Sequence, residues 1–439
     1  MLQIGFSAEN QISQAMFCVS VPGLAEGKGQ AYRAMSGSEL TDGAKLTEQS
    51  AVEAVIYPET NRSTSRFANS DGNTRQLQVP AASFIPVLGL YLAIRVALLL
   101  CNILAATITR ASNWLGPFSA WDGHWYVQVA RTWYGAPGLA SAQLTYAPGG
   151  FEPGWPAVIK FGTLFGLSYS GSAFLMSVVV GAATAYAIWL LSLELIPEHS
   201  MMATTAALVF PGAAFTFGIA YSEVLSIGCI AAALFLLFRR RWAGAGIASM
   251  VATGTSSLAI VLPLVFVVEA FLAIRERREF RSIWAVALSP LGFIGFAAYL
   301  GYHSGDPFYW WKLQGNAWGA RIEPGYIFHW FSSAAGSGWG VFWIAAFGLF
   351  ILAYLVVSMM VSGFPLGAKV YCLAVAVMLL INPALGPKPR FLFWLFPSLL
   401  LLPRNLSPKI LNPLLIFMAL LLPVVAIAYT TIGNTVAQP

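Results

Sequence analysis

Charged residues are scarce in this chain of 439 residues. Only 10% are Asp, Glu, Lys or Arg, whereas 58% are hydrophobic. Soluble domains carry about 25% charged residues, so the composition argues against a water-soluble fold. The mean hydropathy of +0.70 points the same way. We therefore expect an all-α integral membrane protein.

Cysteine and nucleotide-binding motifs are also lacking. The chain has four cysteines and no CxxC or Cys/His spacing, so no disulfide framework or zinc site is predicted. Cys101, Cys229 and Cys372 lie in apolar runs and are interpreted as small buried hydrophobes. No GxxxxGK(S/T) sequence occurs, and the segments between apolar runs on one side are short. ATP and nucleotide sugars are therefore not expected as substrates.

An early apolar run is absent as well. The first long one begins near Ala82, too late for the apolar segment of a secretory signal peptide. Residues 1–81 are rich in Ser, Gly, Asn, Gln, Thr and Glu. This composition is typical of a disordered cytoplasmic tail, or of residues added by an early gene start. We expect residues 82–439 to form the membrane domain.

Long apolar runs dominate the rest of the chain. A helix rises 1.5 Å per residue, so about 20 apolar residues cross the ~30 Å hydrocarbon layer. This length predicts about eleven spans, near residues 82–108, 172–196, 201–219, 222–238, 242–256, 258–274, 283–302, 341–362, 369–383, 391–403 and 410–432.

The basic residues predict the orientation. Ten Lys or Arg residues fall in short segments on one side of the expected bundle, and seven in much longer segments on the other. The positive-inside rule then predicts a multi-pass plasma-membrane protein with a cytoplasmic N-terminus. It also explains the net charge of +6 without a nucleic-acid partner. Two long loops, 109–171 and 303–340, are expected outside the cell.

Both outer loops are crowded with aromatic residues, Gly and Pro. One interpretation is an aromatic belt at the membrane interface. The other is a cleft for a sugar and a prenyl lipid, because long loops in a compact helical bundle often carry the function.

Few carboxylates are available for chemistry on the outer face. Beyond residue 81 the chain has ten, and five fall on the expected outer side: Asp122, Glu152, Glu223, Asp306 and Glu323. Asp122 precedes a glycine, as many turn residues do. It also lies among Trp121, His124, Trp125 and Tyr126, where apolar surroundings can tune a carboxylate.

These residues resemble a known family. The sequence Trp121-Asp-Gly-His-Trp-Tyr126 is similar to the "WD…(W/H)(Y/F)" signature of PIG-V-like mannosyltransferases, relatives of GPI mannosyltransferase II. Further similar segments follow in the same order: Phe151–Pro156, Phe210-Pro211, Tyr221–Glu223, Gly305–Phe308 with Gln314 and Trp318-Gly319, and Lys388–Phe391 with Pro397. Two segments depart from the family pattern: Glu152 follows Phe151 where "FFP" is usual, and Thr253–Ser257 stands where "TRP" is usual.

The resemblance implies a GT-C glycosyltransferase fold and transfer of mannose from a polyprenyl phosphate, with inversion, on the extracytoplasmic face. Inverting displacement needs a carboxylate to accept the acceptor's proton, and Asp122 is the predicted general base. The departing phosphate needs cations rather than an acid. Arg390 and Lys388 are the preferred clamp, with Arg131, Lys312 and Arg321 in reserve; ordinary snorkelling at the interface is the alternative for Lys388 and Arg390.

The remaining predictions concern ligands and competing functions. The predicted sugar and acceptor contacts are Trp121, His124, Trp125, Tyr126, Glu223 and Asp306. No cofactor or essential metal is expected, because no second His stands at ligand spacing from His124, although an Asp122/Asp306 cation site stays open. The acceptor is left open between a glycolipid, a lipoglycan and a protein. The alternatives are a multi-span transporter or lipid flippase, and a non-catalytic subunit of a glycosylation complex.

Overall fold

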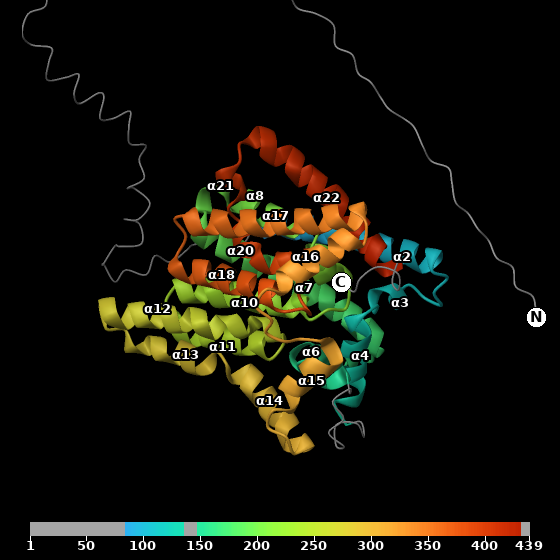
Figure 1. Ribbon diagram of the computed structural model, residues 1–439, viewed down its shortest axis with the longest axis horizontal. Coiled ribbons are helices and arrows are strands. Elements are labelled where there is room, and N and C mark those ends of the chain that lie inside the picture. The colour runs from blue at the N-terminus through green and yellow to red at the C-terminus, as the bar shows by residue number, and fades with distance from the viewer. Residues whose placement is uncertain (1–83, 136–146, 432–439) are drawn as a thin grey trace, which may run out of the picture. The chain divides into compact units, whose positions relative to one another are not determined.

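The structure is a computed structural model that describes residues 84–135 and 147–431, all of which fall in one compact unit. Within these ranges every regular element is a helix (Figure 1). The predicted tail, residues 1–81, lies outside the described residues, as does part of the first outer loop.

The longer helices are α2 (Ile85–Ile108), α7 (Tyr169–Leu195), α10 (Glu223–Phe238), α11 (Trp242–Thr253), α12 (Val261–Arg277), α14 (Leu291–Ser304), α17 (Trp339–Val361), α18 (Leu366–Ile381) and α22 (Pro408–Thr431). The shorter helices are α3 (Leu115–Phe118), α4 (Asp122–Thr132), α6 (Gly154–Thr163), α8 (Ser200–Leu208), α9 (Ala213–Gly218), α13 (Ile283–Leu288), α15 (Tyr309–Trp318), α16 (Tyr326–Gly336), α19 (Pro389–Leu392), α20 (Phe396–Leu399) and α21 (Leu402–Asn405). Single 3₁₀ turns are η3 (Ala147–Gly150), η4 (Pro197–His199), η5 (Ser257–Ile260), η6 (Phe280–Ser282) and η7 (Phe393–Leu395).

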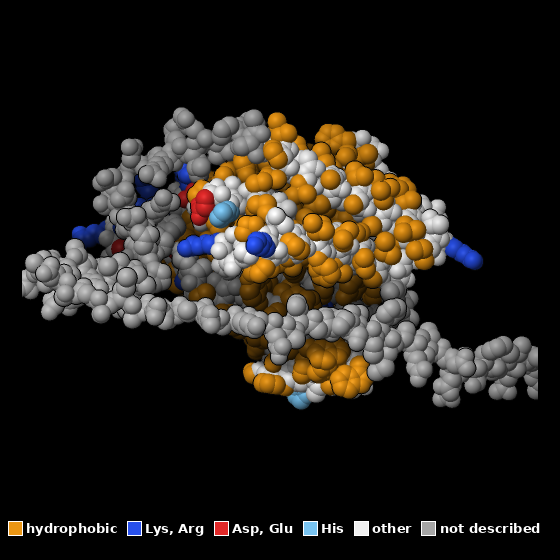
Figure 2. Space-filling view, turned by 90° about the horizontal axis from the view of Figure 1, so that it is seen from above, with side chains coloured by type: hydrophobic (Ala, Val, Ile, Leu, Met, Phe, Trp, Pro, Cys, Tyr) orange, Lys and Arg blue, Asp and Glu red, His pale blue; other side chains and the backbone are white. Residues whose placement is uncertain are grey.

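The described helices confirm a multi-pass membrane protein. Six helical stretches among them are long and apolar enough to cross a bilayer, and three shorter apolar helices, α10, α11 and α18, pack with them. Hydrophobic side chains cover most of the described face seen in Figure 2. Ile344, Phe347 and Phe350 of α17 each expose more than half of their surface. Such exposure suits contact with lipid rather than with water.

Two expected spans consist only of short helical pieces, and a third, 283–302, is interrupted at Ser289 and Pro290 between α13 and α14. The segment 201–219 divides into α8 and α9, which are separated by Pro211 and Gly212, and the segment 391–403 consists of short pieces from α19 to α21 that contain Pro397 and Pro403. Proline removes a backbone donor and clashes with the carbonyl four residues earlier, so it ends or bends a helix. These two segments are therefore not single helices, although the all-α membrane fold is as predicted.

The two broken segments pack against each other in the core. The rings of Phe210 and Phe393 stack with their centroids 6.2 Å apart. Gly212 lies so close to the Pro389 carbonyl oxygen that a Cβ at this position would overlap it. This contact brings α19 next to α9, and Arg390 of α19 forms an ion pair with Glu223 at the beginning of α10.

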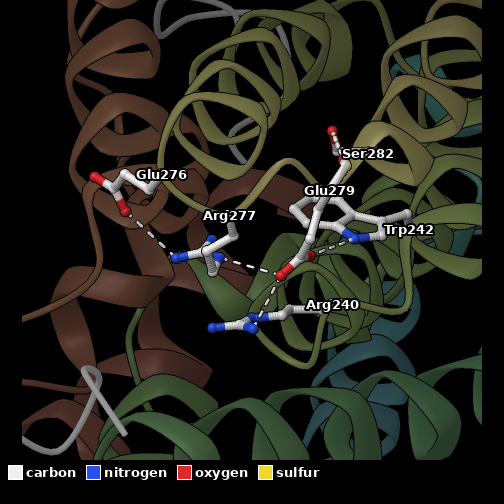
Figure 3. A network of polar contacts seen from close by, with 6 residues as sticks. All are labelled: Arg240, Trp242, Glu276, Arg277, Glu279 and Ser282. Atoms are coloured by element: carbon white, nitrogen blue, oxygen red, sulfur yellow. Dashed lines mark hydrogen bonds and ion pairs between the residues drawn. The ribbon is translucent and has the colours of Figure 1, made fainter. Parts of the chain in front are cut away.

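The other end of α10 carries a different polar group. Glu279 accepts hydrogen bonds from Arg240 (3.0 Å), Arg277 (3.1 Å) and the Trp242 indole (3.2 Å), which joins the α10–α11 and α12–η6 turns (Figure 3). Because α10 has 16 residues, these turns lie about 24 Å along the helix from Glu223. The arginine-rich turns and Glu223 are thus at opposite ends of the bundle.

Candidate active site

A cavity of about 350 Å³ lies where the two predicted outer loops meet the broken helices. Residues of α4, η3, η5, α10, α15 and α19 contribute to its wall. Its polar and charged lining consists of Asp122, Tyr126, Glu152, Ser222, Glu223, Ser256, Ser257, Gln314, Lys388 and Arg390, and its aromatic lining includes Trp121, Trp125, Phe151, Trp318, Phe391 and Trp394.

Helix α4 presents one face to this cavity. Asp122 is its first residue, and Trp125 and Tyr126 follow at the spacing that puts side chains on one side of a helix. His124 lies two residues after Asp122, is exposed, and does not line the cavity. Trp121 precedes the helix with φ +57°, a strained conformation for a bulky residue, and its indole donates to the Tyr429 carbonyl at 2.9 Å.

Arg390 joins two carboxylates at the centre of the site. Its Nη1 donates to Asp122 Oδ2 at 2.7 Å, and its Nε donates to Glu223 Oε1 at 2.5 Å. The guanidinium also lies over the Tyr221 ring, 4.2 Å from its centroid. Arg390 and Glu223 are buried, whereas 25% of the Asp122 side chain is exposed. Asp122 is therefore the member of this group that a ligand in the cavity can reach most easily.

The segment before α10 holds Glu223 in place. The Ala220 N–H donates to the Phe118 carbonyl at 2.9 Å, and the Trp155 indole donates to the Ala220 carbonyl at 3.1 Å. The hydroxyls of Tyr126 and Ser222 are 2.6 Å apart. The residues before Glu223 are thus tied to both α4 and α6, so its carboxylate faces Arg390 from a rigid support.

Two further ionisable groups line the cavity from loops outside the membrane-spanning helices. Burial and the neighbouring Arg390 lower the pKa of Lys388 to about 8. Burial raises the pKa of Glu152 to about 7, although hydrogen bonds from Ser257 oppose the increase. Glu152 is 4% exposed. Glu152 was not among the predicted site residues. Two sequence features could have indicated it: it is one of five outer carboxylates, and it departs from the "FFP" pattern.

Besides His124, four predicted residues lie away from the cavity: Asp306, Lys312, Arg321 and Arg131. Asp306 pairs with Lys312 at 2.7 Å, and this hydrogen bond lowers the pKa of the Asp306 carboxyl. Arg321 pairs with Glu323 at 2.6 Å. Arg131 lies over the Tyr169 ring, 5.5 Å from its centroid. The predicted donor and acceptor contacts that do share the cavity with Asp122 are Trp121, Trp125, Tyr126, Glu223, Lys388 and Arg390.

The arrangement suits proton transfer beside an anion. A partly exposed carboxylate stands next to two cationic side chains in an aromatic cavity, an arrangement that suits displacement of a phosphate by a hydroxyl. Among the described residues, no three His, Cys, Asp or Glu side chains are grouped so as to hold a metal ion.

Comparison with known sequences assigns the chain to a family. The model of glycosyltransferase family 87 matches residues 155–383, just over half of the sequence. The chain belongs to glycosyltransferase family 87. It is therefore a membrane glycosyltransferase, as the sequence predicted. The match includes Glu223 and three of the similar segments quoted above, Phe210-Pro211, Tyr221–Glu223 and Gly305–Phe308, but not Asp122 or Arg390.

Curated protein sequences and solved structures give two further comparisons. No curated protein sequence matches the chain. Among solved structures, the crystal structure of ArnT from Cupriavidus metallidurans bound to undecaprenyl phosphate is similar, with 17% sequence identity and a TM-score of 0.49. The similarity covers 82% of this chain and 67% of that one. The likeness to PIG-V-like enzymes and the identity of the sugar stay predictions.

Proposed function

We propose that this glycosyltransferase moves mannose from a polyprenyl phosphate to a hydroxyl of a glycolipid, lipoglycan or protein, on the extracytoplasmic face and with inversion. The observation that carries the proposal is the contact between Asp122 and Arg390, because it puts a proton acceptor and a phosphate-binding group side by side in one cavity.

The proposed reaction is a single displacement. The acceptor hydroxyl gives its proton to the Asp122 carboxylate, and its oxygen attacks the anomeric carbon of the sugar. The bond between that carbon and the phosphate oxygen breaks, and the lipid phosphate departs as an anion. Lys388 and Arg390 stabilise the developing charge; Nε and Nη1 of Arg390 bind carboxylates, which leaves Nη2 for the phosphate.

The donor follows from the membrane setting and the cavity chemistry. The cavity lies in a helical membrane protein in which no nucleotide-binding motif occurs, and its wall is cationic and aromatic. A sugar carried on a lipid phosphate reaches such a site through the bilayer, and aromatic faces suit both the sugar and the prenyl chain. The PIG-V-like motif order supports mannose as the sugar.

The proposal is tested with purified protein in detergent or nanodiscs. Labelled polyprenyl-phosphate-mannose and a membrane lipid extract are supplied, and the labelled product is identified by mass. We expect a mannosylated lipid or glycan that forms with wild-type protein and not with Asp122→Asn. Transfer from a different prenyl-phosphate sugar would correct the sugar alone, whereas no transfer from any of them would overturn the donor assignment.

A further inference from the structure

Glu152 is the one buried carboxyl of the cavity that the proposed reaction does not use. It lies between η3 and α6, and the backbone on both sides is fixed: Gln314 donates to the Gly150 carbonyl at 2.9 Å, and the Gly154 N–H donates to the Gly254 carbonyl at 2.9 Å. The Phe151 carbonyl accepts a hydrogen bond from Tyr134. These hydrogen bonds fix the backbone on both sides of Glu152 and so hold its side chain in the wall of the cavity.

The Glu152 carboxyl carries an unsatisfied oxygen. Its Oε1 is buried and makes no hydrogen bond with the described residues. Hydrogen bonding by Ser257 opposes the rise that burial causes in the pKa of this carboxyl. A buried polar atom without a partner is destabilising, and a ligand that hydrogen-bonds to the carboxyl recovers part of that cost.

The charges around Glu152 favour its neutral form when an anion is bound. Asp122 of α4 and Glu223 of α10 are balanced by Lys388 and Arg390 near α19, while Tyr126, Ser257 and Gln314 are neutral. With Glu152 protonated, these side chains sum to zero; with Glu152 ionised, the sum is −1. A phosphodiester adds a further negative charge, which makes an ionised Glu152 still less favourable.

We propose that Glu152 is a proton-carrying ligand of the donor phosphate: its neutral carboxylic acid donates a hydrogen bond to the phosphodiester in the cavity that it lines, and donor binding takes up a proton. The inference rests on the proposed function for the identity of the anion. The burial-raised pKa of about 7 supports it, because the free carboxyl is then partly ionised at neutral pH and protonates when the phosphate arrives. Affinity is accordingly highest below pH 7 and is lost as the pH rises through 7.

The test measures binding without sugar transfer. The probe is the methyl diester of farnesyl phosphate, whose single charge does not change between pH 6 and pH 8. In wild-type protein its affinity should fall about tenfold between these values through Glu152, and further by about twofold as Lys388 loses its proton. Glu152→Gln keeps a neutral hydrogen-bond donor, so it should bind as wild type at pH 6 and retain only the smaller fall.

Two further variants make the outcome decisive. Lys388→Arg cannot titrate in this range and should keep the tenfold fall, and Glu276→Gln, at the opposite end of the bundle, should behave as wild type. The proposal is overturned if Glu152→Gln keeps the full pH dependence, or if folded Glu152→Gln does not bind at pH 6. The assay needs no turnover. If the wild-type protein transfers no sugar from any prenyl phosphate, but Glu152→Gln loses the pH dependence of binding, the proposed function is refuted and this inference is supported.

Discussion

Arg390 and Asp122 are 268 positions apart in the sequence, yet Arg390 Nη1 lies 2.7 Å from the Asp122 carboxylate. The contact forms because two proline-broken segments replace continuous helices in the core and bring α19 beside the beginning of α10. Glu223 holds the guanidinium from the other side at 2.5 Å. The site therefore depends on helix breaks as much as on the residues that perform the chemistry.

Replacement of Asp122 tests the general base. Asp122→Asn keeps the shape but loses the proton acceptor, and general bases contribute about 10²–10⁴-fold to rate. We expect turnover to fall by at least ~10² while the protein still inserts and binds donor. Asp122→Glu should recover little, because a shift of about an ångström can cost ~10². The measurement is the initial rate of transfer from labelled polyprenyl-phosphate-mannose.

The matched control for Asp122 is Asp306, an outer carboxylate that is paired with Lys312 away from the cavity. Asp306→Asn should keep turnover near that of wild type. If Asp122→Asn is active and Glu223→Gln is not, the base is Glu223. If neither change affects turnover, the base assignment fails.

Arg390 should affect both donor binding and rate. Arg390→Ala removes charged hydrogen bonds worth about 1.5–3 kcal/mol each, which corresponds to a 10- to 150-fold loss in kcat/KM for the donor. It also leaves Asp122 and Glu223 without their shared cation. Arg390→Lys should recover only part, since a point charge replaces a planar fork. If Arg390→Ala has the donor kinetics of the wild type, Arg390 does not bind the donor.

Part of this site could be predicted from the sequence. The order of the motifs predicted that Asp122, Glu223, Lys388 and Arg390 belong to one active site. In the structure all four line one cavity. The position of His124 outside the cavity was harder to predict. A helix turns about 100° per residue, so residue i+2 faces away from residue i. That distinction requires knowledge that Asp122 begins a helix rather than a turn.

Other features depend on tertiary contacts that a sequence does not display. Asp306 and Arg321 carry charges suited to the site, but each finds a partner within six residues, Lys312 and Glu323 respectively. The continuous apolar run of 391–403 satisfied the length of a span, but in the fold its proline-broken pieces pack against α8, α9, α17 and α18. Burial of Glu152 likewise arises from loops that meet only in the fold.

Lys388 predicts a pH effect on donor binding. Burial lowers its pKa to about 8, so its ammonium is fully charged below pH 7 and is lost as the pH rises through 8. The donor KM should therefore rise in a step centred near pH 8. Lys388→Arg stays charged and should abolish that step, whereas Lys388→Ala should have a high KM throughout. A step near pH 8 that persists in Lys388→Arg would assign it to another group.

The arginine-rich turns predict the orientation, and they lie at the opposite end of α10 from Glu223. A reporter fused after Arg241 or Arg278, in the arginine-rich turns of Figure 3, should report the cytoplasm. A reporter inserted near Gly336 should report the outside. Both reporters on one side would contradict the proposed orientation, and the extracytoplasmic site with it.

Gly212 links the helix break to catalysis. A Cβ at this position would overlap the Pro389 carbonyl oxygen, so Gly212→Ala should push α19, and with it Arg390, away from α10. We expect a loss of about 1–3 kcal/mol in stability, the usual cost of overpacking, and at least tenfold lower turnover because Arg390 no longer meets both carboxylates. Gly89→Ala is the control: nothing lies within 4 Å of its Cβ, and alanine favours a helix. The unfolding temperature and the transfer rate should therefore drop in Gly212→Ala, whereas in Gly89→Ala the unfolding temperature should not fall and the transfer rate should stay unchanged. Wild-type rates in Gly212→Ala would mean that the approach of the broken segments does not position Arg390.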